Sequence, residues 1–340
     1  MGTTIISAAT NSDPDTGSYF ELAARAALAC VERSGVGLDE VGMLVNAGVF
    51  RDRNISEPAV SALIQKRIGL GPAYEAERAP AFSFDLMHGA TGLLHALVTA
   101  DSFLATGAVR YALLVAGDTH PSTRRHVAGF PYSATGAALL LGTSPTAGGF
   151  GQLQFHETTG VVDPTAWVAL DDAGAGGRSA MCVRAGAEDP VALATAAVRS
   201  CLDAEGLDGA DFAEGNAVLL APVRDFGFRT RLADTLAIPS ASVVGFDPSI
   251  GDPYTAAPVH AYLNALDTGS IDTARTVIFL AADGASAACL AYHPRPAAPA
   301  RQKTLAWNRI GHDEKSPRRG RWSAPVDTGR AGGRAEDNVQ

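Results

Sequence analysis

The chain has few charged residues, no excess of positive charge and no long apolar run. Charged side chains make up only 19% of the 340 residues, and the net charge is −9. A nucleic-acid surface needs clustered positive charge, so this balance argues against such a function. The longest apolar runs, such as Tyr111–Gly117 and Ala137–Gly142, fall far short of the roughly 20 residues that span a membrane. We therefore expect no contact with nucleic acid or membrane.

Cysteine is scarce, and other signals for bound groups are missing. None of the four cysteines belongs to a C-x-x-C pair, so we expect buried, reduced thiols and no disulfide or zinc site. The glycine run 174–177 lacks the strand, helix and lysine of a phosphate loop, and we expect no cofactor. The start, Met1–Asn11, has neither the basic residues nor the apolar length of a signal peptide. These absences predict a cytoplasmic protein. The cysteines are Cys30, Cys182, Cys201 and Cys289.

Two segments of the chain repeat each other. Leu22–Gly35 and Leu193–Gly206 share apolar residues at helical spacing and a final glycine at the same offset. Further on, Thr106-Gly107 and Thr268-Gly269 each precede an apolar β-type run. Strands that alternate with helices indicate parallel sheets covered on both faces. The repeat therefore predicts an α/β body of two similar halves, residues 1–150 and 151–296, followed by a disordered tail, residues 297–340.

The segment Phe84–Leu94 has the pattern of a strand, a tight turn and a helix. The second correspondence maps Ala90, at the turn, onto Asp252 in the other half, and each residue precedes a predicted helix. Pseudo-symmetry would bring these two helix starts together. Free N–H groups and partial positive charge at helix starts suit a developing oxyanion or a thioester carbonyl.

The arrangement resembles the thiolase superfamily, and most closely its ketoacyl-acyl-carrier-protein synthase III branch. The resemblance extends over roughly residues 3–293 and implies a thiolase-like fold, a layered αβαβα body that dimerises through its first half. It rests on Phe84-Asp85, Gly92, Ala100-Asp101, Gly107–Val109, Tyr111–Leu113, Asp118, Pro222, Gly251, Ala256 and Gly284.

Members of this family use a cysteine, a histidine and an asparagine for condensation. The resemblance places Ala90 at the cysteine, Val223 at the histidine and Asp252 at the asparagine. An alanine methyl group cannot attack a thioester, and valine cannot supply an imidazole. The resemblance therefore implies an acyl-transfer scaffold without the usual condensing chemistry.

Two further departures bear on the partners. The predicted strand Thr3–Ala9 passes almost directly to a helix near Ser18, which omits the family's segment for the coenzyme A adenine. Glu57 stands where the family has an apolar residue that enters the partner's acyl tunnel, and a charge there is costly to bury. The expected partner is therefore a cysteine-bearing ketosynthase paralogue, with a second copy of this chain as the alternative.

Several residues near the turn allow two interpretations. His88 is a candidate base or acyl acceptor, or else a histidine that donates to a loop carbonyl. Thr91 is a candidate hydroxyl nucleophile or substrate contact, or else a structural residue at the helix start. Asp252 acts as a base or caps its helix. Gly284, in a strand turn of the second half, is a further candidate for substrate binding.

Three functions follow from these observations. The preferred one is a non-condensing subunit, a pseudoenzyme of fatty-acid, polyketide or other acyl biosynthesis that pairs with a cysteine-bearing paralogue. The second is an acyltransferase that moves an acyl group from a coenzyme A or carrier-protein thioester to an acceptor by direct attack. The third is a protein that binds acyl carrier protein or an acyl ligand without chemistry.

Overall fold

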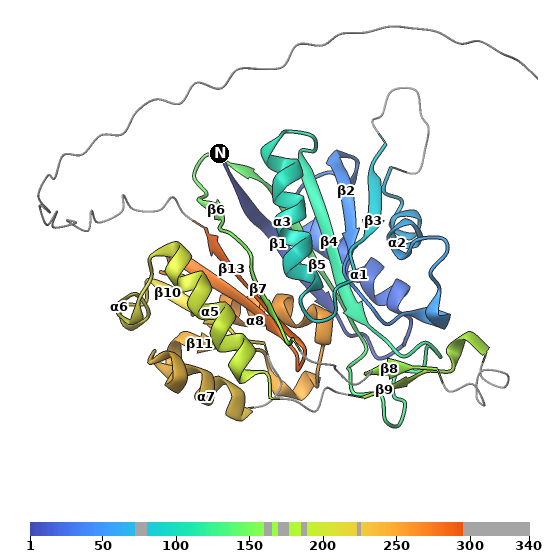
Figure 1. Cartoon of the computed structure of the whole chain (residues 1–340). Helices are drawn as coiled ribbons and strands as arrows, with labels where there is room; N and C mark the ends of the chain where they lie inside the picture. The colour runs from blue at the N-terminus through green and yellow to red at the C-terminus, as the bar shows by residue number, and fades with distance from the viewer. Residues whose placement is uncertain (72–79, 160–164, 169–176, 185–188, 223–225, 295–340) are drawn as a thin grey trace, which may run out of the picture. The chain divides into compact units, whose positions relative to one another are not determined.

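The structure is a computed structural model of the chain. It describes residues 1–71, 80–159, 165–168, 177–184, 189–222 and 226–294, which all lie within one compact unit. Two large sheets and the helices around them make up this unit (Figure 1).

The first sheet has five strands, all from the first half of the chain. Strand β2 lies between two parallel neighbours, β3 and β4, and β5 joins β4 and β1 antiparallel to both. In spatial order the strands are β3 (Phe82–Asp85), β2 (Val41–Asn46), β4 (Tyr111–Asp118), β5 (Thr135–Ser144) and β1 (Gly2–Asn11).

The second sheet repeats this order and these directions. Strand β10 has parallel neighbours β11 and β12, and β13 pairs antiparallel with β12 and with two short strands. Its strands are β11 (Val243–Val244), β10 (Ala217–Leu220), β12 (Thr276–Ala282), β13 (Ser286–His293), β6 (Gly149–Phe150) and β7 (Gln154–Glu157). The sequence repeat thus corresponds to a repeated sheet topology, with the change from one sheet to the other between Ser144 and Gly149.

Three apolar clusters stack the sheets and helices in five layers. One cluster joins both sheets to α3 (Gly92–Ala105) and α8 (Ala257–Asp267). The second packs α1 (Tyr19–Ser34) and α2 (Val60–Ile68) on the first sheet, and the third packs α5 (Val191–Glu205) and α7 (Phe226–Leu236) on the second. Both faces of each sheet are covered, which explains why its strands are continuous apolar runs. The layered αβαβα prediction is confirmed.

The remaining elements are short. Among the described residues they are one α-helix, α6 (Gly209–Ala213), a two-stranded sheet of β8 (Ala166–Trp167) and β9 (Cys182–Val183), and six 3₁₀ turns. The 3₁₀ turns are η1 (Leu38–Glu40), η2 (Asp52–Asn54), η3 (Gly177–Ser179), η4 (Ser240–Ser242), η5 (Pro248–Ile250) and η6 (Tyr254–Ala256).

The helix ends that the repeat predicts are present. Helices α1 and α5 end at Gly35 and Gly206, whose φ angles are 69° and 67°. A side chain at such φ angles is strained, so glycine is the residue that closes both helices. The cysteine prediction holds in part: Cys30, Cys201 and Cys289 are buried, and all four cysteines are free. It is wrong for Cys182, which is only half-buried because β9 lies outside the two large sheets.

Asp85 stabilises the start of α2 from a neighbouring strand. Its two carboxylate oxygens accept the backbone N–H groups of Val60 at 2.8 Å and Ser61 at 2.7 Å. Ala59, the residue before the helix, makes no side-chain cap, so Asp85 supplies the acceptors that the helix start needs. Removing a cap of this kind costs about 1–2 kcal/mol. We expect Asp85→Ala to lower the free energy of unfolding by that amount in urea denaturation. The exposed Asp203 on α5 is the matched control, and equal losses in both variants would contradict the capping role.

Candidate functional site

The turn before α3 has the geometry that the sequence predicts. Gly89 adopts a φ of 54°, and the N–H groups of Thr91 and Gly92 bond back to the carbonyls of His88 and Gly89, both at 3.2 Å. Ala90 is only 6% exposed and directly precedes Thr91, the N-cap of α3. The turn therefore sets the Ala90 side chain at the positive end of α3.

The corresponding helix start of the second half lies beside this turn. A Cβ atom on Gly89 would lie 3.1 Å from the Tyr254 hydroxyl oxygen and 3.5 Å from the Asp283 Oδ2 atom. Tyr254 opens η6, which leads into α8. The prediction that the two helix starts meet is confirmed, and the close approach explains a residue without a side chain at position 89.

Asp252 lies one residue before Pro253, the N-cap of η6. Its Oδ1 atom accepts the Tyr254 N–H at 2.9 Å, and its own carbonyl accepts the Ser133 N–H at 2.7 Å. These bonds hold the loop before α8 in place and fit the capping alternative. A role for Asp252 as a base stays a prediction.

The other predicted site residues lie in different surroundings. Gly284 belongs to the turn between β12 and β13, where Asp283 Oδ1 accepts the N–H groups of Ala285 and Ser286 at 2.9 and 2.8 Å. Because Asp283 also approaches Gly89, this turn borders the predicted nucleophile position. Glu57 is exposed in the single chain. Val223 lies outside the described residues.

The structure has a stack of aromatic rings next to the turn that the sequence does not predict. Tyr132 and Tyr254 stack with ring centroids 4.1 Å apart and an interplanar angle of 16°, and Phe50 stacks on Tyr132 at 5.5 Å. Burial raises the pKa of both tyrosines, and carboxylates nearby, including Asp118 and Asp283, raise it further. Both phenols therefore stay neutral. No spacing in the sequence signals this stack, because Tyr132 comes from a loop and the φ of Tyr254, 43°, sets its direction.

Asp118, at the end of β4, links the two halves. Its Oδ1 atom accepts the N–H groups of Val49 and Phe50 at 3.1 and 2.8 Å. Its Oδ2 atom accepts both the N–H and the hydroxyl of Thr255, in the other half. The side chain is fully buried, and burial raises the pKa of Asp118 to about 7, although these hydrogen bonds oppose the rise.

His88 belongs to a cluster that we call the histidine pair: His88 and His95, with Thr91 and Phe155. The two imidazoles stack with centroids 4.5 Å apart, and the ring of Phe155 meets both edge to face. His88 Nδ1 lies 2.9 Å from the Thr91 hydroxyl, and His95 Nδ1 lies 3.0 Å from the Thr91 carbonyl. His88 thus bonds a hydroxyl and not the loop carbonyl that the sequence interpretation expected.

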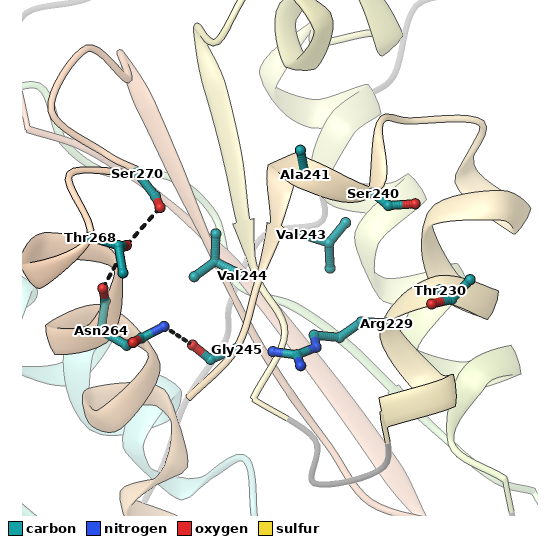
Figure 2. Close-up of a pocket in the computed structure, with 10 residues that line it drawn as sticks. All are labelled: Arg229, Thr230, Ser240, Ala241, Val243, Val244, Gly245, Asn264, Thr268 and Ser270. Carbon is teal, nitrogen blue, oxygen red and sulfur yellow. Dashed lines mark hydrogen bonds between the residues drawn. The ribbon is translucent and has the colours of Figure 1, made fainter. Parts of the chain in front are cut away.

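Two cavities among the described residues lie away from these groups. One, of about 440 Å³, opens between α7 and α8 at the β11 edge, and Figure 2 shows Asn264 donating to the Gly245 carbonyl across it. A second, of about 430 Å³, lies between α8 and β12. None of the predicted site residues lines either cavity.

Within the described residues, no cluster of three or more His, Cys, Asp or Glu side chains has the geometry to hold a metal ion. Among the same residues, no helix combines the length and apolar character needed to cross a membrane.

Solved structures with this fold include ketoacyl synthases. The chain superimposes on the 3-oxoacyl-(acyl carrier protein) synthase III of Pseudomonas aeruginosa PAO1 with a TM-score of 0.68 and 18% identity, covering 87% of this chain and 99% of that one. It also matches the priming β-ketosynthase of the R1128 polyketide pathway, with a TM-score of 0.62 and 18% identity over 87% and 97% of the two chains.

Sequence comparison points the same way over a shorter stretch. The β-ketoacyl-acyl-carrier-protein synthase III of Alkalilimnicola ehrlichii is 33% identical over 107 residues, which are 32% of this chain. The matched part spans only 29% of that synthase. No family model matches the chain.

The two repeated halves and the turn before α3 define a thiolase-like fold. Within that class the chain is similar to ketoacyl-acyl-carrier-protein synthases III, in fold over most of its length and in sequence over about a third of it.

Proposed function

We propose that the chain is a non-condensing subunit of acyl biosynthesis, in the fatty-acid or polyketide class. The observation that carries the proposal is Ala90, whose methyl group stands at the positive start of α3, where a nucleophile would be needed. The helix start still offers N–H groups and partial positive charge to a thioester carbonyl. Binding without condensation is the function that this combination supports.

The aromatic stack supports the same proposal. Condensation needs a carbanion to form beside the acylated nucleophile, stabilised by polar groups. Here the stacked rings of Tyr132 and Tyr254 lie beside Gly89, and burial keeps their phenols neutral. These rings fill space next to the helix start and supply neither an imidazole nor a base.

The exposed edge of the first sheet is the surface that we assign to a partner subunit. Strand β3 is the last strand of its sheet. Phe82, on this strand, is 39% exposed, and Met87, just after it, is 43% exposed. Unpaired sheet edges with apolar side chains favour pairing with another chain. We assign this edge to a cysteine-bearing ketosynthase paralogue, with a second copy of this chain as the alternative occupant.

A charge on this edge is expected to weaken the complex. Met87→Glu places a carboxylate among apolar groups that would be buried, so we expect the dissociation constant of the pair to rise at least about 10-fold. Native mass spectrometry of the chain mixed with the paralogue measures this. Leu28→Glu, on the equally exposed Leu28 of α1 (44%), is the control. If Met87→Glu and Leu28→Glu bind the paralogue equally well, the interface does not lie at the β3 edge.

The proposed function is tested by assaying condensation of acetyl-coenzyme A with malonyl-acyl carrier protein. The chain alone is expected to form no β-ketoacyl product. The paralogue is expected to change its rate or its product length when the chain is added. A product from the chain alone would refute the proposal, and so would a paralogue whose rate and products the chain leaves unchanged.

A further inference from the structure

The hydrogen bonds of the histidine pair determine which ring nitrogens carry protons. His95 Nδ1 faces the Thr91 carbonyl at 3.0 Å, and a carbonyl only accepts, so His95 Nδ1 is protonated. The Thr91 hydroxyl donates its single proton to the His88 carbonyl at 2.9 Å. His88 Nδ1, at 2.9 Å from that hydroxyl oxygen, must therefore donate to it. Both neutral rings carry hydrogen on Nδ1 and a lone pair on Nε2.

Thr91 holds His88 in this state from a fully buried position. The residue is 0% exposed, whereas His88 is exposed, so the bond ties Nδ1 to a buried residue, and Nε2 is the other nitrogen of an exposed side chain. The stacked His95 and the edge of Phe155 limit rotation of the ring. An exposed histidine with a fixed tautomer and a free basic nitrogen has the properties of a general base.

The pair also borders the turn where an acyl thioester is proposed to bind. His88 is two residues before Ala90. Phe155 lies on β7, in register with Ala288 of β13. The same strand begins at Ser286, directly after the turn of Asp283 that approaches Gly89. The His88 imidazole therefore packs on a residue of β7, which pairs with β13, while the glycine next to His88 approaches the β12–β13 turn.

We propose that His88 Nε2 is the base of a direct acyl transfer. An acceptor hydroxyl or amine attacks the thioester carbonyl while Nε2 takes its proton; the carbon–sulfur bond then breaks, and the proton passes to the leaving thiolate. The products are the acylated acceptor and the free thiol. Thr91 is the positioning residue of this base. The activity rests on the thioester binding that the non-condensing subunit is proposed to have.

Other roles for the cluster fit less well. The Thr91 hydroxyl is buried and its proton is committed to the His88 carbonyl, so it is poorly placed to attack a thioester. A metal ion held by both rings is also unfavourable: the rings are stacked at an interplanar angle of 22°, so their Nε2 lone pairs lie in two nearly parallel planes and do not converge on one point.

The test measures release of coenzyme A from acetyl- and octanoyl-coenzyme A, with 2-aminoethanol and hydroxylamine as acceptors. The full chain is expected to release thiol above the buffer rate and to form the acylated acceptor by mass. His88→Gln is expected to lower this rate about 100-fold. His126→Gln, on an exposed histidine elsewhere, is the control and is expected to keep the full rate.

Thr91 is tested by variants that keep or remove its hydroxyl. Thr91→Val is expected to lower the rate at least about 10-fold, and Thr91→Ser to restore it, because only the hydroxyl accepts from His88 Nδ1. In the wild type, ¹⁵N resonances are expected to show hydrogen on His88 Nδ1, and in Thr91→Val a mixture of both tautomers.

No thiol release above the buffer rate, or full activity in His88→Gln, would overturn the proposal. A folded Thr91→Val variant with unchanged rate and tautomer would remove Thr91 from it. These outcomes differ from failure of the proposed function, because formation of a β-ketoacyl product is a separate assay that needs malonyl-acyl carrier protein.

Discussion

The Ala90→Cys variant is expected to leave condensation of acetyl-coenzyme A with malonyl-acyl carrier protein at the background rate. A cysteine at the start of α3 would gain a thiolate that the helix stabilises. It would still lack the imidazole that the family's mechanism requires, because the resemblance to the family places Val223 at that position. The stacked rings of Tyr132 and Tyr254 add no base near the thiol.

The same variant provides its own control. Alkylation by iodoacetamide, followed by intact mass, shows whether the new thiol is reactive. We expect a reactive thiol that produces no β-ketoacyl compound, whereas condensation well above the wild-type rate would show that Ala90 is the single missing group. Because removal of one member of a catalytic set can lower activity by orders of magnitude, restoring one of three is insufficient.

The largest effect on stability is expected for Asp118→Ala. The change leaves the N–H groups of Val49, Phe50 and Thr255 without their carboxylate in a fully buried place. Buried donors without acceptors are costly, and we expect the free energy of unfolding to fall by roughly 3–4 kcal/mol. Urea denaturation measures this. Asp15→Ala, at a side chain that is 57% exposed, is the control and is expected to change stability much less, because solvent screens its ion pairs.

The same carboxylate gives stability a pH dependence of known sign. Burial raises the pKa of Asp118 to about 7 in the folded chain, whereas an unfolded aspartate titrates near 3.9. Between these values the folded state binds more protons, so the contribution of Asp118 falls as pH rises from about 4 to about 7 and is constant above. The difference in unfolding free energy between wild type and Asp118→Asn is expected to show this slope. A difference that does not vary between pH 5 and pH 8 would contradict it.

The layers and the nucleophile turn could be predicted from the sequence because local patterns encode them. Residues near one another in the chain set the apolar strand runs and the glycines at the ends of α1 and α5. The repeat between the halves can be read directly by comparing the two segments. The meeting of the two helix starts followed from the repeat alone, since equivalent elements of two similar halves face each other. Gly89 beside Tyr254 confirms that inference.

The chemistry around the turn could not be predicted, because it depends on residues far apart in the sequence. The stack of Tyr132 on Tyr254 joins a loop of the first half to the start of α8. The sequence marked His88 and Thr91 separately; their hydrogen bond is local and depends on the rotamers of both side chains, whereas the ring of Phe155 reaches the pair only when β7 pairs with β13. Side-chain rotamers and long-range pairing decided these contacts, and no spacing reports them.

The central claim is that this chain binds acyl thioesters without a nucleophile of its own. Its most direct test is the intact mass of the protein after incubation with acyl-coenzyme A and acyl-carrier-protein thioesters. The mass is predicted to stay that of the unmodified chain with every donor, including those whose thiol is released when an acceptor is present. A stable acyl adduct that maps to one residue would contradict the account, because it would show a nucleophile that takes the place of the missing cysteine.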